Sequence, residues 1–472
     1  MIAIPLLFLA INFIHDETLA QRENYSSGIH TAASPVSGRE FTLVPDVYGR
    51  LTIDNADKTY KPGDILNLKG NFKSVYISNL SGSASAPIII QNAKNTVVTI
   101  GVPSWNGGGY SSGCSFWNCH YIRFGGRKDM DQVVINGSTQ AAREAYRDLQ
   151  LESKSDNMEI CNLTINNGGN GIVAKTDPVK GDATTLYPNT VMQNLLIHDL
   201  IINGTKNEAM YIGHTATYWD FTANIPYYGP PSGFTPGHQY VQPILWRNVR
   251  IYNNIVKNIG LDGIQTAATD GLEISNNEIS NWAMQRNSSH NGGIVIGGRT
   301  TNTNTHDNYV HDGYGEFCQF YGSGENGATH IINNNLFRDN QSNGISLRGT
   351  ANAIVRITNN TIAGTKENSL RINGYTGMTG KQIVQSNAFI APYFGNSGMQ
   401  SRCFIYVEVN GAVTEGTGEQ ENKKFYTVNS AGVNPSNYYL PLSGSPMGRA
   451  GYRRPAPAAQ ASTQSSRASL EE

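Results

Sequence analysis

The stretch Ile251-Tyr-Asn-Asn254-Ile-Val256 decides the fold, because close copies of it return along the chain. Each copy places an apolar residue or threonine three positions before an asparagine and an apolar residue two positions after it. The further copies are Ile274-Ser-Asn-Asn277-Glu-Ile279, Thr305-His-Asp-Asn308-Tyr-Val310, Ile332-Asn-Asn-Asn335-Leu-Phe337, Ile357-Thr-Asn-Asn360-Thr-Ile362 and Val384-Gln-Ser-Asn387-Ala-Phe389. The anchoring asparagines follow one another by 23, 31, 27, 25 and 27 residues. A drifting period of this length is typical of a repeat architecture.

A second apolar segment follows each anchor at a nearly fixed distance. Its copies are Ala209-Met-Tyr-Ile212, Gly263-Ile-Gln-Thr266, Gly293-Ile-Val-Ile296, Phe317-Cys-Gln-Phe320, Gly344-Ile-Ser-Leu347 and Ser369-Leu-Arg-Ile372. Strands this short cannot bury a face alone, but stacked coils pair equivalent strands and bury one continuous apolar column. Asparagine suits the turns, because it tolerates the left-handed backbone region and its amide can bond the next asparagine in the stack. Since no 3.6-residue period accompanies the repeat, the sequence predicts an all-β parallel solenoid.

Three stretches carry a resemblance to a known superfamily. They are Gly63-Asp-Ile-Leu-Asn-Leu-Lys-Gly70 followed by Ser85-Ala-Pro-Ile-Ile-Ile-Gln91, the Asn-Asn repeat itself, and Tyr438-Tyr-Leu-Pro-Leu-Ser-Gly-Ser-Pro446. Over residues 40–450 the chain resembles a right-handed parallel β-helix of the pectate-lyase-like superfamily. The resemblance implies the fold strongly and the activity weakly, because this scaffold hosts lyases, hydrolases, epimerases and non-catalytic binders.

The two ends of the chain differ from the repeat region. Ile4 to Ile14 is an apolar run of the length found in secretory signals, so residues 1–20 are expected to be a signal peptide. Residues 21–39 are expected to be a flexible leader and residues 451–472 a disordered tail rich in Pro, Ala and Ser. We therefore expect a secreted, cell-surface or periplasmic protein without a membrane span. In such a compartment Cys114 and Cys119 could close a small disulfide loop.

Composition narrows the classes of partner. The chain has 35 basic and 36 acidic residues, a net charge of -1, and so lacks the basic excess of a nucleic-acid binder. It has no GxxxxGK[ST] motif, which argues against nucleotide-dependent chemistry. We expect a monomer.

The insertion between Gly213 and Gln242 is the densest cluster of Tyr, Trp and Pro in the chain, and it includes Trp219. It is interpreted either as a sugar-binding loop or as a packed cover.

The fixed offset aligns residues of successive coils into columns. Inward residues are expected at Met210, Ile264, Ile294, Cys318, Ile345 and Leu370, so the following residues should face solvent by alternation. That outer face carries Tyr211, Gln265, Val295, Gln319, Ser346 and Arg371, then Gly213, Ala267, Gly297, Tyr321, Arg348 and Asn373 two positions later. This polar and aromatic face is predicted to bind substrate, through Tyr211, Gln265, Gln319, Tyr321, Asn373 and Trp219.

An acidic column precedes these strands and contains Glu208, Asp262 and Glu316. Strand spacing predicts that Glu208 and Asp262 are near neighbours, with Glu316 two coils further on. Two carboxylates this close raise one pKa unless a cation lies between them. The column is therefore interpreted as an acid and nucleophile pair, as a Ca²⁺ site formed by Glu208 and Asp262, or as simple turn caps.

Basic and titratable residues extend the candidate site. Arg348 and Arg371 fall on neighbouring coils, where guanidinium groups could grip a uronate carboxylate. His214 and His290 are candidates for acid or base chemistry near neutral pH. The resemblance adds that several lyases of the superfamily use Ca²⁺ or a basic residue to neutralise the uronate. We therefore expect a lyase acting on a uronate-containing polysaccharide, with a glycoside hydrolase or a non-catalytic carbohydrate binder as alternatives.

Overall fold

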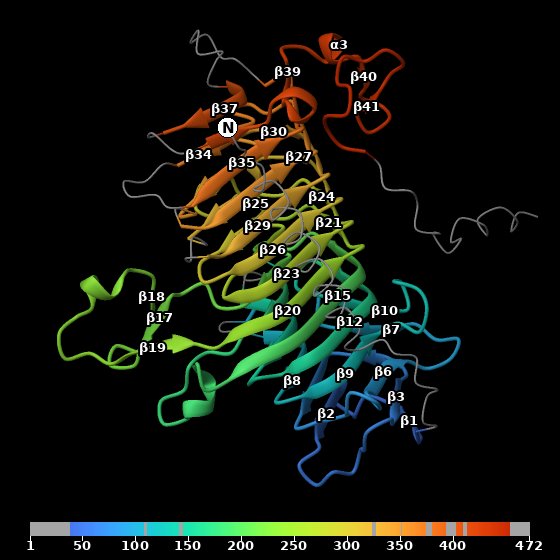
Figure 1. Ribbon diagram of the computed structural model, residues 1–472. Helices are drawn as coiled ribbons and strands as arrows, with labels where there is room; N and C mark the ends of the chain where they lie inside the picture. Colours follow the sequence, from blue (N-terminus) through green and yellow to red (C-terminus); the bar gives the residue numbers. More distant parts are fainter. Residues whose placement is uncertain are drawn as a thin grey trace, which may run out of the picture.

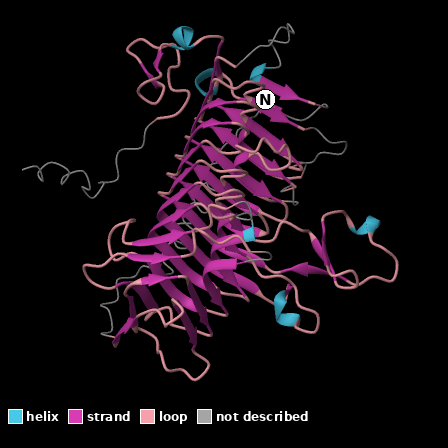
Figure 2. Ribbon diagram, turned by 180° about the vertical axis from the view of Figure 1, so that it is seen from behind, coloured by secondary structure: helices cyan, strands magenta, loops and turns pink. Residues whose placement is uncertain are grey.

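The computed structural model describes residues 38–107, 111–140, 145–322, 327–350, 352–373, 380–392, 403–408 and 413–453. These residues wind into a right-handed parallel β-helix, a stack of coils that rises from the first strands to the last (Figure 1). Figure 2 shows the same stack from behind, with the strands of each coil running alongside those of the next. The predicted fold class is confirmed. The signal peptide, residues 21–37 of the leader and residues 454–472 of the tail lie outside the described residues.

One face of the solenoid is a twelve-stranded parallel sheet with one strand from each coil. Its strands are β2 (Arg50–Asp54), β5 (Ser74–Ser78), β8 (Ser111–Trp117), β11 (Tyr146–Glu152), β13 (Asn170–Ala174), β16 (Met210–Ile212), β22 (Ile264–Thr266), β25 (Gly292–Gly297), β28 (Glu316–Tyr321), β31 (Ile345–Arg348), β34 (Leu370–Ile372) and β37 (Ile405–Val407). Met210 pairs with Ile264, and the register continues through Ile294, Cys318, Ile345 and Leu370. All six of these side chains are fully buried, so the predicted inward column is confirmed.

A 23-stranded sheet forms the other two faces, with two rows of strands joined by shared members. The first row is β1 (Glu40–Leu43), β3 (Ile65–Leu68), β6 (Ile88–Asn92), β9 (His120–Gly125), β12 (Asp156–Asn166), β15 (Val191–Asn203), β20 (Leu245–Tyr252), β23 (Thr269–Ser275), β26 (Thr301–His306), β29 (Thr329–Asn333), β32 (Ile354–Thr358), β35 (Lys381–Gln385) and β38 (Val413–Glu415). The second row is β4 (Asn71–Phe72), β7 (Val98–Ile100), β10 (Val133–Asn136), β21 (Ile255–Lys257), β24 (Glu278–Ser280), β27 (Tyr309–Gly313), β30 (Leu336–Asn340), β33 (Thr361–Ala363), β36 (Ala388–Ile390) and β39 (Lys423–Phe425), and the long β12 and β15 serve both rows. Between the faces, the interior is filled by Ile, Leu, Val and Phe side chains.

The anchoring asparagines form a buried ladder between the two rows. Nδ2 of Asn254 donates to Oδ1 of Asn277 at 2.9 Å, and Asn277 donates in the same way to Asn308 at 3.0 Å. The ladder continues through Asn335, Asn360, Asn387 and Asn422. The predicted amide stacking is thus confirmed. The left-handed conformation belongs instead to the residue before each anchor, such as Asn253 with φ 57° and Asn276 with φ 54°.

The aromatic insertion projects from the side of the stack as a small antiparallel unit (Figure 1). Its strands are β17 (Tyr218–Asp220), β18 (Ile225–Tyr227) and β19 (Tyr240–Pro243), and β19 also pairs with β14 (Leu186–Tyr187), which precedes the insertion in the sequence. Phe234 stacks on Tyr240 with ring centroids 3.8 Å apart, and Tyr218 packs edge-on against Phe234 at 4.9 Å. The aromatic rings of the insertion therefore pack largely on one another.

The end of the described chain folds back along the stack after α3 (Val428–Ala431), β40 (Val433–Asn434) and β41 (Leu440–Pro441). The backbone N–H of Gly451 donates to Ser386, that of Tyr452 to Thr361, and that of Arg453 to Asn334. These three acceptors lie on three successive coils. Residues 451–453 are therefore hydrogen-bonded along the side of the solenoid.

Two further expectations concern cysteines and membranes. Cys114 and Cys119 are both fully buried and are not joined by a disulfide, so the small loop considered from the sequence is absent from the structure. None of the helices in the described part of the chain has the length and apolar character needed to cross a bilayer.

Candidate active site

The outer surface of the twelve-stranded sheet brings residues from distant repeats into rows. The register that pairs Met210 with Ile264 also sets Glu208 beside Asp262, two residues before each strand begins to pair. The next register pair sets Gly292 beside Glu316. Glu208 and Asp262 thus occupy adjacent coils, and Glu316 lies two coils beyond Asp262, in the order that the repeat predicted.

His290 binds both members of the adjacent acid pair. Its Nδ1 lies 3.3 Å from Oδ2 of Asp262 and 3.4 Å from Oε1 of Glu208. One carboxylate oxygen of each acid and one ring nitrogen of His290 all lie within 4.8 Å of one another. The two carboxylates are buried, whereas the His290 side chain is 40% exposed. The imidazole therefore covers the acid pair on the solvent side.

The pKa values of His290 and Asp262 are both raised, but by different causes. Hydrogen bonds to Asp262 and then Glu208 raise the pKa of His290 to about 10, against the opposing effect of burial. Burial raises the pKa of Asp262 above its ordinary value, and the nearby Glu208 charge adds to the rise. His290 is therefore an imidazolium at neutral pH and supplies the cation that two close carboxylates require.

Backbone and side-chain donors complete the cluster. The N–H of Gly292 donates to Oδ1 of Asp262 at 2.7 Å, because the inserted turn carrying His290 closes directly over that carboxylate. Nδ2 of Asn170 donates to Oε2 of Glu208 at 2.5 Å from the preceding coil. The sequence analysis did not predict Asn170 as a site residue, although counting two residues back from Ile172, which pairs with Met210, places Asn170 in the same column as Glu208.

Glu316 is not a third free acid of this row. Its carboxylate accepts two bonds of 2.6 Å from the guanidinium of Arg348 and one of 2.7 Å from Ser346. Nδ2 of Asn343 donates to it as well, at 3.3 Å. Glu316 is 1% exposed, so this ion pair is a buried cross-link between coils.

Arg348 and Arg371 lie on neighbouring coils, as predicted, and each forms an ion pair within the protein. Arg348 is held by Glu316, and Arg371 forms an ion pair with Glu408. The guanidinium of each is thus neutralised by a glutamate of the protein rather than presented to a ligand. Asn373, one coil beyond Arg348 in the same column, has a buried Oδ1 that accepts no hydrogen bond from the residues that the structure describes.

His214 and Trp219 lie together in the wall of the insertion. His214 is 3% exposed, its Nε2 lies 3.1 Å from Oδ1 of Asp177, and its ring packs edge-on against Trp219 at 5.7 Å. Burial lowers the pKa of His214 despite the nearby Asp177. Both residues are separated from the Glu208 and Asp262 pair, so the structure does not bring His214 into that cluster.

The predicted substrate-binding residues differ in their access to solvent. Gln265 and Gln319 are buried, whereas Tyr321 is 64% exposed. Tyr211 lies next to Gln265 in the sheet register, and its hydroxyl shares a 2.7 Å hydrogen bond with Thr215. Tyr321 is therefore the most open aromatic surface of this group.

A cleft that the sequence did not indicate opens toward the first coils. It has a volume of about 370 Å³ and is lined by Trp117, Asn118, Glu152, Ser153, Lys154, Lys175, Thr176, Asp177, Val179, Asp182 and Thr185. The indole of Trp117 is 38% exposed, and Tyr76 packs against it with ring centroids 6.2 Å apart. The early coils lack the Asn-Asn anchor, so no sequence period aligned Trp117 with the later columns.

Several solved structures resemble this chain at low sequence identity and with TM-scores below 0.5. The GH136 lacto-N-biosidase from Eubacterium ramulus has a TM-score of 0.45 and 13% identity over 88% of this chain and 70% of its own. The alginate lyase from Paenibacillus sp. has a TM-score of 0.41 and 13% identity, over 82% and 99%. The periplasmic alginate epimerase AlgG has a TM-score of 0.37 and 11% identity, over 80% and 85%. The sequence itself matches no family profile and no curated protein.

The stacked coils and parallel registers decide the architecture. This chain is a right-handed parallel β-helix. In this β-helix the acid pair lies on the twelve-stranded sheet, near the middle of the stack, and the Trp117 cleft opens on the same sheet several coils earlier.

The acid pair of the β-helix fits Ca²⁺ poorly. Ca²⁺ takes six to eight oxygen ligands. Here the third group beside Glu208 and Asp262 is a nitrogen of His290, and Oδ1 of Asp262 is already bonded to the N–H of Gly292. We therefore derive no catalytic step through calcium.

Proposed function

We propose that the protein is an exported enzyme that cleaves a polysaccharide at the cluster of Glu208, Asp262 and His290. One observation carries this proposal. The two buried acids are 54 residues apart in the sequence, yet they lie together under one partly exposed imidazole. Structural ion pairs elsewhere on the sheet join one acid to one base, as Glu316 and Arg348 do. Two acids sharing one base, with one acid raised in pKa, is an arrangement typical of catalytic sites.

Hydrolysis with retention is the reaction that the acid pair supports best. Retaining glycosidases place their two carboxyl groups about 5–5.5 Å apart, with one protonated as general acid and the other ionised as nucleophile. Oxygens of Glu208 and Asp262 lie within 4.8 Å of each other. The buried Asp262 has the raised pKa expected of the acid, which assigns the nucleophile to Glu208. In this scheme the imidazole of His290 orients both carboxylates and lies at the edge of the bound sugar.

β-Elimination on a uronate-containing glycan is the second candidate, and one specific observation favours it. The half-exposed His290 imidazolium can neutralise a uronate carboxylate, and Lys154 and Lys175 line the cleft beside Trp117. Lys175 pairs with Asp177 at 2.6 Å and Lys154 lies 3.8 Å from Asp182, just as Arg348 and Arg371 pair with glutamates, so an acidic sugar would have to replace a carboxylate of the protein at each of these cations.

The substrate path follows one column of the twelve-stranded sheet. From Trp117 the register runs through Glu152, Lys175, Gly213, Ala267 and Gly297 to Tyr321. Six strand spacings separate the two exposed aromatic rings, which corresponds to about 29 Å. The small residues in the middle of this column, Gly213, Ala267 and Gly297, are buried. Aromatic faces at both ends suit the apolar faces of several linked sugars.

A panel of neutral and uronate-containing polysaccharides tests the proposal, with and without a calcium chelator. New reducing ends without ultraviolet absorbance indicate hydrolysis, whereas both together indicate elimination, because elimination leaves a conjugated double bond. Asp262→Asn should abolish either signal in a folded protein. Tight binding of a glycan without any cleavage across the panel would contradict an enzymatic role and support the non-catalytic binder.

A further inference from the structure

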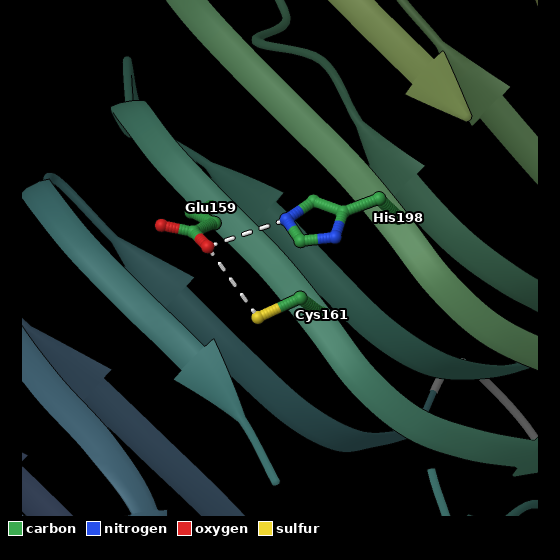
Figure 3. A group of neighbouring side chains, drawn as sticks. All are labelled: Glu159, Cys161 and His198. Atoms are coloured by element: carbon green, nitrogen blue, oxygen red, sulfur yellow. Dashed lines mark hydrogen bonds and ion pairs between the residues drawn. The ribbon is translucent and has the colours of Figure 1, made fainter. Parts of the chain in front are cut away.

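A second cluster of chemically reactive side chains lies on a different face of the solenoid. Glu159 and Cys161 project from β12 and His198 from the adjacent β15, and the three side chains point toward one another (Figure 3). Sγ of Cys161 lies 3.6 Å from Oε1 of Glu159, and Nε2 of His198 lies 3.2 Å from the same oxygen. One potential ligand atom from each residue falls within 4.8 Å of the other two. The glycan-cleaving function proposed above does not use this cluster.

The ring of His198 is fixed in the orientation of a metal ligand. Its Nδ1 lies 2.7 Å from Oδ2 of Asp199, and the ring stacks on Tyr252 with centroids 4.7 Å apart and planes at 8°. Metal-binding histidines commonly donate the other ring N–H to a carboxylate, which fixes the tautomer and raises the basicity of the ligating nitrogen. Asp199 supplies that carboxylate and leaves Nε2 directed at Glu159 and Cys161.

Two of the three separations within the cluster, both from Oε1 of Glu159, match edges of a tetrahedral zinc site, and the third, between Sγ of Cys161 and the His198 nitrogen, is within 4.8 Å. With bonds of about 2.0 Å to N and O and 2.3 Å to S, tetrahedral angles give edges of about 3.3 Å for N to O and about 3.5 Å for S to O. The corresponding distances are 3.2 Å and 3.6 Å. Carboxylate, thiolate and imidazole together form a donor set that selects zinc over calcium or magnesium.

The β-helix contains an internal copy of the arrangement without the sulfur. On β23 and β26, Glu273, Ser275 and His306 occupy equivalent positions, since Ser275 pairs with His306 as Cys161 pairs with His198. Oγ of Ser275 donates to Oε1 of Glu273 at 3.1 Å, and Nε2 of His306 lies 3.5 Å from that oxygen. In the copy a serine hydroxyl occupies the position of the Cys161 thiol, so we expect Cys161→Ser to be accommodated by the coil.

We propose that Glu159, Cys161 and His198 bind one Zn²⁺ ion, with water as the fourth ligand. On binding, the Cys161 thiol loses its proton to solvent and its sulfur lone pair forms the bond to the metal, so no oxidant or reductant is needed. Arg123, whose Nε lies 3.5 Å from Oε1 of Glu159, turns away from the carboxylate when the cation enters. The ion then links β12 to β15 across 37 residues of chain.

Cobalt substitution in the full chain tests the site, because a thiolate bound to Co²⁺ gives a near-ultraviolet charge-transfer band. The wild-type protein should develop this band up to one equivalent of Co²⁺, and Zn²⁺ should displace it. Cys161→Ser should lose the band while keeping the circular dichroism of the wild type. Ser275→Cys completes the donor set of the copy and should gain a second equivalent. The acid pair with His290 contains no sulfur and cannot give this signal.

Each outcome decides the proposal. A band that reaches one equivalent in the wild type, disappears in Cys161→Ser and doubles in Ser275→Cys supports it. The proposal is overturned if the folded wild-type protein shows no band, or if Cys161→Ser retains it. It is equally overturned if Ser275→Cys folds and binds no second ion, since the geometry shared by the two copies would then not be what binds the metal.

Discussion

Glu316 and Arg348 lie on adjacent coils of the twelve-stranded sheet and are joined by two contacts of 2.6 Å, with the carboxylate almost fully buried. The hydrogen bond from Ser346 adds a third fixed donor. The pair therefore holds the later coils together beside the proposed substrate path.

Removing this carboxylate should destabilise the protein. Glu316→Ala leaves the half-buried guanidinium of Arg348 without its counter-ion, which costs about 3 kcal/mol of the free energy of unfolding. Urea denaturation measures the loss. Glu419→Ala removes the acid of an exposed pair with Arg449 and should not shift the midpoint measurably. Equal midpoints for the two variants would show that the buried pair contributes nothing.

Asp262→Asn should reduce turnover of a cleavable polysaccharide by at least about 100-fold, the usual contribution of a general acid. The amide is the same size and can still accept from the N–H of Gly292, so the melting temperature should remain near that of the wild type. Asp270→Asn, on the 23-stranded sheet, is the matched control and should turn over normally. Unchanged kinetics in Asp262→Asn would remove Asp262 from the reaction.

The His290 imidazolium should stabilise the folded protein at low pH and lose this effect as the pH rises. Its pKa is raised to about 10 in the folded protein, above the unfolded value of about 6.5. The stabilisation is therefore fully present below pH 6.5 and is lost as the pH rises toward 10. The melting-temperature difference between wild type and His290→Gln should be largest near pH 6 and should shrink toward pH 10. A difference that grows with pH contradicts the assignment of His290 as a cation.

Interrupting the asparagine ladder should lower the free energy of unfolding substantially. Asn308 donates to the carbonyl of Ile274 and to Oδ1 of Asn335, and accepts from Asn277. Asn308→Ala leaves these buried partners unsatisfied and should cost at least about 2 kcal/mol. Gln341→Ala, at an exposed position, should change stability by less than about 0.5 kcal/mol. Comparable midpoints in chemical denaturation would refute a stabilising role for the ladder.

Trp117 should contribute to binding rather than chemistry. If the glycan runs from Trp117 to Tyr321, Trp117→Ala removes a stacking surface and should raise KM about tenfold, with kcat little changed. Tyr48→Ala removes another exposed ring outside this path and serves as the control. A Trp117→Ala enzyme with unaltered KM on long and short substrates would exclude this end of the path.

The sequence predicted the features that depend on backbone period. The register from Met210 to Leu370 and the ladder from Asn254 onward follow from a repeat whose strands must stack, so counting residues was sufficient. The contacts of long side chains did not follow. The reach of Arg348 back to Glu316 depends on side-chain conformation, which no spacing encodes.

Two parts of the site lay beyond the periodic signal. His290 was recognised as a candidate, but its position over Glu208 and Asp262 is set by the path of an inserted turn. Trp117 belongs to coils without the Asn-Asn anchor, where loop lengths vary and the column cannot be extended by counting. In this β-helix, irregular loops therefore set the positions of His290 and Trp117, and the repeat period does not predict them.

The folded-back segment at Gly451–Arg453 has a mechanical consequence. Because its bonds to Ser386, Thr361 and Asn334 are spread over three coils, tension on that segment is shared by several bonds at once. The last turns of the solenoid would have to slip together under load instead of peeling off one after another.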